Sequence, residues 1–244
     1  MGARVGLSGR GDVRVPLRVS HIIFDVDGTL VDFASSLRTA LEVAARRASR
    51  LSGSHISPGM LQAERDAIAV EPGMRAVPLR TIRTMAIRRV LSRHGLEGED
   101  AVEAISAAFF EARDAELRAF DDVDRPLAEL ESRGFTLIAA SNGNAALDRL
   151  PIARRFAHTH SPPTVGTVKP DPGFFLTILE LTGGRPQTSV SVGDRLENDY
   201  LPPRSIGMHA VLVDRAGTNR TPGVMRVPSL LSLPGLLEPV PGRS

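Results

Sequence analysis

The alternation of apolar and amphipathic segments after residue 120 constrains the fold of this chain more than any other feature. We predict strands at four segments: 135–140, 157–159, 188–193 and 209–213, of which the first is largely apolar and the third has alternating valines. Segments with helical periodicity precede or separate them: 121–133, 144–150, 173–182 and 197–206. Strands that alternate with helices are typical of a doubly wound parallel sheet, so the pattern predicts an α/β fold.

One more apolar strand, Ile22-Ile23-Phe24, precedes a long helical stretch. Beyond Asp32, apolar residues recur with a helical period in four segments: 34–51, 60–70, 78–94 and 100–119. We therefore predict an all-helical cap at 33–119, inserted into a discontinuous core that consists of 20–32 and 120–244. Residues 1–19 are rich in glycine and arginine, and we expect a flexible tail or one added strand there.

Acidic residues stand directly after two of the predicted strands. Asp25 and Asp27 follow the first strand, and Asp194 follows the strand at 188–193. Open α/β sheets bind ligands at the carboxyl ends of their strands, so these carboxylates mark a candidate site. Taken alone, Asp27-Gly28 is also typical of a tight turn.

Two further polar positions allow both a structural and a functional interpretation. Asp199 falls in the first turn of the helix predicted after Asp194, where acidic residues are favoured in any case. Ser141 and Asn142 follow the strand at 135–140 and precede a helical pattern. A hydroxyl and free main-chain amides at such a place can bind an anion, although serine is also a common N-cap.

Almost all basic residues of the chain are arginines. The chain has 30 lysines and arginines together, and Lys169 is the only lysine among them. A lysine kept in such a composition indicates a site that needs a compact ammonium rather than a planar guanidinium. The alternative is a single surface lysine without a role.

Four motifs occur in the order typical of the haloacid dehalogenase-like (HAD) phosphohydrolases, and the chain resembles this family from residue 20 to about 213. The motifs are Asp25-Val26-Asp27-Gly28-Thr29, Ser141-Asn142, Lys169-Pro170 and Gly193-Asp194 through Asp199. Each motif is short, and their order and their positions after strands make the set specific. The resemblance implies a Rossmann-like HAD core with a helical cap.

The resemblance further implies a Mg²⁺-dependent phosphatase that hydrolyses a small-molecule phosphomonoester through an aspartyl-phosphate. A carboxylate can attack phosphorus once the phosphate is neutralised, and Mg²⁺ prefers oxygen ligands. The catalytic residues would be Asp25 as nucleophile, Asp27 as general acid and base, and Lys169. The metal residues would be Asp25, Asp27, Asp194 and Asp199, with Asp194 as a direct ligand and Asp199 as a supporting group.

Substrate binding is assigned to residues of the motifs and of the predicted cap: Ser141, Asn142, Thr29, Arg75 and Arg80. Arginines at helical spacing mostly face solvent, so the two cap arginines also have that interpretation. The expected partner is a small phosphorylated metabolite, and no motif in the cap identifies it.

Composition argues against several other classes of protein. The sequence pI of about 9.8 accompanies a net charge of only +2, and the arginines are interspersed with acids, so we expect no nucleic-acid partner. The chain has no cysteine, which excludes disulfides, thiolate catalysis and zinc–thiolate sites. Without a long apolar run or the apolar centre of a signal peptide, we expect no membrane partner and a cytoplasmic protein.

The same motifs are compatible with alternatives to a phosphatase. A phosphomutase of the same superfamily would use the same two aspartates, but its relatives generally carry Glu-Asp where this chain has Gly193-Asp194. A catalytically idle binding or regulatory protein would not need Lys169 and intact carboxylates. Dehalogenation is not expected, because the family members that perform it lack an acid at the position of Asp27.

Overall fold

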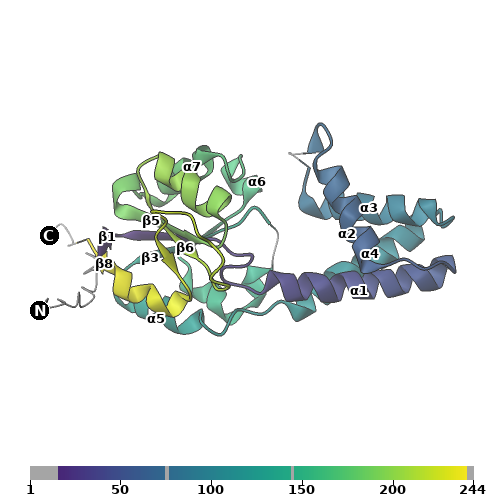
Figure 1. The fold of residues 1–244 in the computed structure, drawn as a ribbon, viewed down its shortest axis with the longest axis horizontal. Coiled ribbons are helices and arrows are strands. Elements are labelled where there is room, and N and C mark those ends of the chain that lie inside the picture. Colours follow the sequence, from purple (N-terminus) through teal and green to yellow (C-terminus); the bar gives the residue numbers. More distant parts are fainter. Residues whose placement is uncertain (1–15, 75–76, 144–145, 241–244) are drawn as a thin grey trace, which may run out of the picture.

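The computed structural model describes residues 16–74, 77–143 and 146–240. Its main sheet has six strands in the order β4-β3-β2-β5-β6-β7, and every neighbouring pair is parallel (Figure 1). The strands are β2 (His21–Phe24), β3 (Thr136–Ala140), β4 (His158–His160), β5 (Ser189–Gly193), β6 (His209–Val213) and β7 (Arg226–Val227). The predicted α/β fold with a parallel sheet is confirmed.

Alternate residues of the strands supply two hydrophobic cores, one on each face of the sheet. Ile22 of β2 belongs to the cluster that α5 (Asp124–Ser132) covers. Ile23 belongs to the opposite cluster, which α7 (Pro172–Thr182) covers. Because successive side chains of a strand point to opposite faces, apolar residues at consecutive positions of β2 are buried on both sides.

β2 lies in the middle of the sheet, with β3 on one side and β5 on the other. Its last residue, Phe24, pairs with Ala139 of β3 and with Val192 of β5. The chain fills one half of the sheet with β3 and β4 before it crosses to β5 and β6, so β2 marks the switch point of the topology. Residues that directly follow β2, β3 and β5 therefore meet at one edge.

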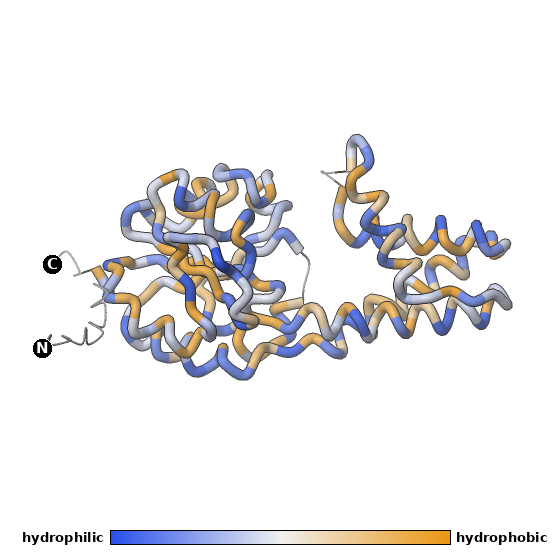
Figure 2. The backbone as a smooth tube through the Cα atoms, viewed as in Figure 1, coloured by the Kyte–Doolittle hydropathy of each residue, from blue (hydrophilic) through white to orange (hydrophobic). Residues whose placement is uncertain are grey.

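Four helices between β2 and β3 pack on one another beside the core and form what we call the cap (Figures 1 and 2). They are α1 (Phe33–Ser52), α2 (Pro58–Ala69), α3 (Leu79–Arg93) and α4 (Glu99–Glu116). Their apolar side chains form clusters of their own. Two adjacent segments connect the cap to the core: the N–H of Asp32 donates to the carbonyl of Arg118 at 2.9 Å, and that of Phe120 donates to Leu30 at 3.1 Å.

The ends of the cap helices follow from local sequence signals. The carboxylate of Asp32 accepts a hydrogen bond from the N–H of Ser35 at 3.1 Å and so caps α1. Gly53 ends α1 with a φ of 67°, a conformation that glycine adopts without strain. Ser57 caps α2 and is followed by proline at the first helical position.

The connections after β3 and β5 differ from the predicted helices. After β3, 3₁₀ turns at Leu147–Arg149 and Pro151–Arg155 replace the helix expected at 144–150. Leu150, the residue before Pro151, is extended with a ψ of 142°, because the ring of a following proline disfavours the helical conformation. After β5, a π-helical turn (Leu196–Tyr200) precedes the short helix α8 (Leu201–Ser205). The short α-helix α6 (Pro162–Val165) lies between β4 and α7.

A small second sheet joins the two ends of the described chain. β1 (Leu17–Val19) pairs in parallel with β8 (Leu237–Pro239). An added strand is therefore present at the end of the predicted N-terminal extension, while residues 1–15 lie outside the described residues. β7 and β8 were not predicted, since they are strands of 2 and 3 residues in a proline-rich part of the chain, and proline argues against a strand. Among the described residues, no helix has the length and apolar content to span a membrane.

Candidate active site

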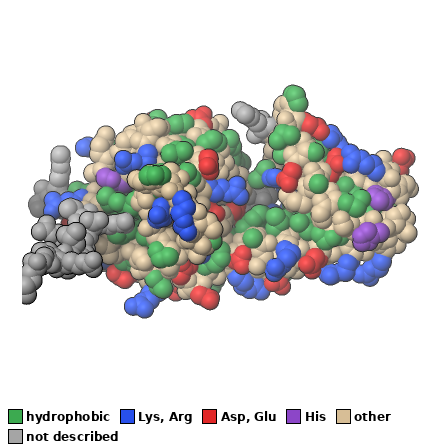
Figure 3. Space-filling model, in the orientation of Figure 1, with side chains coloured by type: hydrophobic (Ala, Val, Ile, Leu, Met, Phe, Trp, Pro, Cys, Tyr) green, Lys and Arg blue, Asp and Glu red, His purple; other side chains and the backbone are tan. Residues whose placement is uncertain are grey.

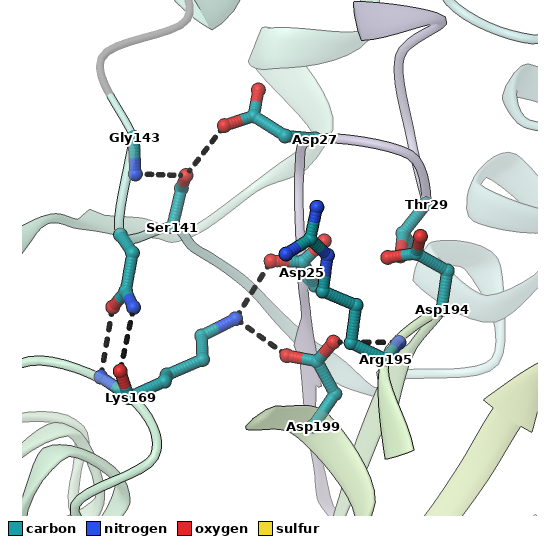
Figure 4. A network of polar contacts seen from close by, with 10 residues as sticks. Asp25, Asp27, Thr29, Ser141, Gly143, Lys169, Asp194, Arg195 and Asp199 are labelled. Carbon is teal, nitrogen blue, oxygen red and sulfur yellow. Dashed lines mark hydrogen bonds and ion pairs between the residues drawn. The ribbon is translucent and has the colours of Figure 1, made fainter. Parts of the chain in front are cut away.

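Three carboxylates meet at the carboxyl edge of the sheet (Figure 4). Asp25 follows β2, Asp194 follows β5, and Asp199 lies in the π-helical turn after β5. Each offers an oxygen atom, and these atoms all lie within 4.8 Å of one another. The fold thus brings together three of the four residues that the sequence analysis assigned to a metal.

Lys169 provides the positive charge next to these carboxylates. Its ammonium donates to Asp25 Oδ1 at 2.7 Å and to Asp199 Oδ1 at 2.8 Å, and the residue is only 5% exposed. Burial alone would lower the pKa of Lys169, but the two carboxylates outweigh burial and raise this pKa above its ordinary value. Lys169 is therefore a charged group of the site and not a surface lysine.

Asn142 holds the main chain of Lys169 in place. Its Oδ1 accepts a hydrogen bond from the N–H of Lys169, and its Nδ2 donates to the carbonyl of Lys169, both at 2.8 Å. This two-point contact joins the loop after β3 to the loop before α7. The sequence indicates only the main-chain amide of Asn142 as a candidate ligand, and it gives no sign of this side-chain contact.

Asp199 satisfies both interpretations that the sequence left open. Its Oδ2 accepts a hydrogen bond from the N–H of Arg195 at 3.1 Å, as a residue at the start of a helix does, while its Oδ1 faces Lys169. Burial, together with the charge of Asp25, raises the pKa of Asp199 to about 7 against the opposing effect of Lys169. Gly193 permits this packing, because a Cβ there would lie 2.3 Å from the Cβ of Asp199.

Asp27 occupies a different environment from Asp25. Its Oδ2 accepts a hydrogen bond from the hydroxyl of Ser141 at 3.2 Å, and its Oδ1 is buried without a hydrogen-bond partner among the described residues. Burial and the nearby Asp25 raise the pKa of Asp27 to about 6. The carboxylate points toward Ser141 and Gly143 (Figure 4) and is not part of the three-carboxylate cluster. The metal-ligand role expected for Asp27 stays a prediction.

Gly143 is a site residue that the sequence analysis missed. Its N–H donates to Ser141 Oγ at 2.7 Å, so Ser141 caps the turn that follows β3. A Cβ at position 143 would lie 2.1 Å from Asp27 Oδ2, so a larger residue there would displace this carboxylate from its position beside Ser141. The helix once expected here includes residues 144 and 145, which are outside the described chain.

Thr29 lies against Asp194. Its hydroxyl donates to Asp194 Oδ1 at 3.3 Å, and the residue is fully buried. Gly28 has a φ of 93°, and a Cβ there would lie 2.6 Å from Asp194 Oδ2. The turn after β2 therefore packs directly on the carboxylate after β5, and the structure places Thr29 beside Asp194, where we had expected a substrate contact.

Of the two cap arginines assigned to substrate, the structure describes only Arg80. Arg75 lies outside the described residues. Arg80 is exposed on α3, with its guanidinium carbon 3.8 Å from the ring centroid of Phe110. Other arginines of α3 form ion pairs with acids of the cap: Arg88 with Glu99, Arg89 with Glu71 and Arg93 with Glu64. On the face of the cap that Figure 3 shows, basic and acidic side chains both occur.

Two other arginines near the site carried no signal in the sequence. Arg113, on α4, is buried, donates to Asp114, and has a charge that opposes the rise in the pKa of Asp27. Arg215, after β6, donates to the carbonyls of Gly28 and Thr29. Both are single residues outside the motifs, and only the folded chain brings them to the site.

The parallel core, its helical insert and the carboxylates at the switch point are the organisation of a capped α/β hydrolase. The chain belongs to the haloacid dehalogenase-like hydrolase family, whose profile matches residues 19–207.

Several relatives with sequence similarity are named as phosphatases. The chain is 32% identical over 132 residues to the glyceraldehyde 3-phosphate phosphatase of Methanopyrus kandleri, a match that covers 52% of this chain and 57% of that protein. It is 26% identical over 221 residues to phosphoglycolate phosphatase 1 of Pseudomonas aeruginosa, covering 86% of this chain and 75% of the relative. The chain thus spans little more than half the length of the first of these relatives.

Solved structures support the fold. The 2-haloacid dehalogenase of Pseudomonas syringae has a TM-score of 0.76 at 23% identity, covering 89% of this chain and 97% of that one. The HAD-hydrolase YfnB of Bacillus subtilis, solved with magnesium, has a TM-score of 0.68 at 18% identity, covering 90% and 99%. At such identities the likeness concerns the fold alone.

Proposed function

We propose that this chain is a Mg²⁺-dependent phosphatase that hydrolyses a small phosphomonoester through an aspartyl-phosphate on Asp25. The observation that carries the proposal is the position of Asp25, which accepts a hydrogen bond from Lys169 at 2.7 Å within a cluster of three carboxylates. The names of the phosphatase relatives from Methanopyrus kandleri and Pseudomonas aeruginosa support the same class of substrate.

Asp25 would be the nucleophile in this reaction. A carboxylate oxygen of Asp25 attacks phosphorus, and the bond from phosphorus to the leaving oxygen breaks. The ammonium of Lys169 offsets negative charge where the anionic phosphate approaches the anionic nucleophile. Water then attacks phosphorus, the bond to Asp25 breaks, and inorganic phosphate leaves.

Asp27 would transfer the protons. It gives its proton to the leaving oxygen in the first step and takes one from the attacking water in the second. A general acid and base works best with a pKa near the working pH. With a pKa of about 6, Asp27 can carry a proton in the first step and accept one as a carboxylate in the second. The hydroxyl of Ser141, which lies 3.2 Å from Asp27, and the main-chain amide of Asn142 would hold phosphoryl oxygens.

The carboxylate cluster fits a magnesium ion. Three acidic groups with a single ammonium leave excess negative charge, and burial and the charge of Asp25 raise the pKa of Asp194. Both oxygens of Asp199 already accept hydrogen bonds, so Asp25 and Asp194 would hold the ion and Asp199 would support it through Lys169. Bound Mg²⁺ would neutralise charge on the phosphate.

The cap would cover this edge of the sheet, exclude water and contact the leaving group. The substrate would be a small phosphorylated metabolite, consistent with relatives named for glyceraldehyde 3-phosphate and phosphoglycolate. No nucleic acid or membrane is part of the proposal.

Hydrolysis of p-nitrophenyl phosphate tests the proposed function. We expect release of p-nitrophenolate and free phosphate that requires Mg²⁺, stops with EDTA and returns with excess Mg²⁺. Binding of phosphate esters without turnover would instead indicate an idle binding protein. In a panel of phosphorylated metabolites, transfer of phosphate to a sugar without release of free phosphate would indicate a phosphomutase.

A further inference from the structure

Arg215 contacts the turn after β2 from a distant part of the chain. Its Nη1 donates to the carbonyl of Gly28 at 3.0 Å and its Nη2 to the carbonyl of Thr29 at 2.9 Å. The guanidinium carbon also lies 4.1 Å from the ring centroid of Phe120. One planar group thus binds two consecutive carbonyls and stacks on an aromatic ring, an arrangement that lysine cannot reproduce.

Arg215 is itself held by a carboxylate. Its Nη2 lies 2.8 Å from Asp122 Oδ1. Asp122 Oδ2 accepts hydrogen bonds from the hydroxyl of Ser229 and from the N–H of Leu230, both at 2.9 Å. The guanidinium therefore connects the turn after β2, the segment by which the chain returns from the cap, and the segment after β7.

The turn that Arg215 holds is in contact with the acidic cluster. Gly28 packs so closely on Asp194 that a Cβ would lie 2.6 Å from its Oδ2, and the hydroxyl of Thr29 donates to Asp194 Oδ1 at 3.3 Å. A displacement of the two carbonyls would move these groups against Asp194. It would also move Asp27, which directly precedes the turn.

We propose that Arg215 is a positioning residue of the active site, which fixes the turn at Gly28 and Thr29 and so sets the place of Asp194 relative to Asp25 and Asp27. The proposal rests on the proposed function for its kinetic consequence. Its structural consequence, a defined spacing of the metal carboxylates, can be measured without catalysis. Arg215 touches neither the carboxylate cluster nor Lys169 among the contacts described, so it acts through the main chain of the turn.

Arg133 offers a matched control. It also donates to two carbonyls, those of Pro234 and Leu237, lies 5.3 Å from the ring centroid of Phe135, and pairs with Glu129. Its side chain is 31% exposed, against 25% for Arg215. Arg133 lies beside β8, away from the carboxylates, so its substitution should affect stability alone.

The experiment compares Arg215→Ala, Arg215→Lys and Arg133→Ala. Substitutions behind metal ligands typically lower metal affinity or activity by about 10–100-fold. We expect a loss of this size for Arg215→Ala in kcat on p-nitrophenyl phosphate and in Mg²⁺ affinity by calorimetry, with a smaller change in KM. Arg215→Lys should recover little of it, whereas millimolar guanidinium should recover part of the activity of Arg215→Ala. Arg133→Ala should match the wild type in both measurements, with a comparable fall in melting temperature.

Wild-type kcat and Mg²⁺ affinity in a folded Arg215→Ala protein would overturn the proposal, as would equal losses in Arg133→Ala. If Arg215→Ala does not fold, the same two measurements on Arg215→Lys decide, since that variant keeps a charge opposite Asp122. A wild-type protein without phosphatase activity would refute the proposed function instead. The calorimetric comparison would then still test the role of Arg215.

Discussion

At the scale of single residues, Asp25 and Asp27 have opposite environments although one residue separates them. Asp25 accepts a hydrogen bond from a buried ammonium, while Asp27 has one buried oxygen without a partner in the described structure and a pKa raised to about 6. Burial, together with the charge of Asp25, is the cause of the raised pKa of Asp27. This difference matches the two chemical roles proposed for them.

Substitution of each aspartate should separate the two roles. Asp25→Asn removes the nucleophile, so we expect no turnover and no phosphorylated protein. Asp27→Asn keeps the nucleophile, and we expect turnover to fall by about 10²–10⁴-fold. Because p-nitrophenolate leaves without a proton, the aspartyl-phosphate should still form in Asp27→Asn and then persist. Rapid quench followed by intact mass should detect the phosphoryl adduct.

Two outcomes would contradict this assignment. The first is an adduct on the Asp25→Asn protein, and the second is equal residual turnover in both variants. Circular dichroism of both variants serves as the control for folding.

Lys169→Arg should not restore activity although it keeps the positive charge. The ammonium fits between two carboxylates at 2.7 and 2.8 Å in a site where the residue is 5% exposed, and a guanidinium is larger and planar. Misplaced groups of this kind cost on the order of 10²-fold in rate, and we expect at least that loss in kcat. Arg133→Lys is the reverse substitution away from the site and should leave kcat unchanged. Wild-type turnover in Lys169→Arg would refute the role of the ammonium.

At the scale of elements, local signals explain which predictions succeeded. The cap helices carry apolar periodicity and caps such as Asp32 and Ser57, and their bounds came out within a few residues. The described segments after β3 and β5 are not the regular α-helices expected there, because Pro151 holds Leu150 extended at the end of one and the other begins with a π-helical turn around Asp199. π-Turns often occur at functional sites, where packing overrides local preference.

The segment before α5 depends on the charge of Asp122. Burial alone would raise the pKa of Asp122, but hydrogen bonds from Arg215, Leu230 and Ser229 lower it below its ordinary value. A carboxylate with a lowered pKa stabilises the folded state above its unfolded pKa, and this contribution is lost as the pH falls through the folded pKa. Stability should therefore decline in acid partly through this residue.

Asp122→Asn should lower the free energy of unfolding by about 1–3 kcal/mol at neutral pH. The difference from the wild type should begin to shrink as the pH falls below about 4, where the unfolded carboxyl group takes up a proton, and should vanish below the lowered pKa of folded Asp122. Urea titrations at several pH values measure this, with the exposed neighbour Asp121→Asn as a control expected within about 0.5 kcal/mol of wild type. A difference that stays constant into acid would exclude the charge as its cause.

At the scale of the whole molecule, cap and core have separate hydrophobic clusters and meet through two adjacent connections. Val31 and Ala119 form an antiparallel bridge there, so a short linker can replace the cap. We expect a protein in which Asp32 is linked to Ala119 to unfold cooperatively and to hydrolyse p-nitrophenyl phosphate. Its ratios of kcat/KM between metabolites should approach one, because the cap would select substrates. Aggregation under all conditions would show that the domain boundary is wrong.

The candidate site was predictable only where its residues form contiguous motifs. The sequence indicates Asp25 and Asp194 because they directly follow strands. It indicates Lys169 because this is the only lysine of the chain. Gly143 and Arg215 belong to the site because segments that are distant in the sequence pack closely together. A Cβ at position 143, for example, would lie only 2.1 Å from Asp27 Oδ2. Such distances arise from packing, and no local pattern encodes them.

The small sheet of β1 and β8 determines on which side of the molecule a fusion partner or a solid support would be attached. The N–H of Val240 donates to the carbonyl of Val19 at 3.1 Å, so the two ends of the described chain leave the core side by side, at the end opposite the cap (Figure 1). A fusion partner or a solid support linked to either end would hold the same side of the molecule. The carboxylates and the cap would then face away from the attachment, with space for the cap to move.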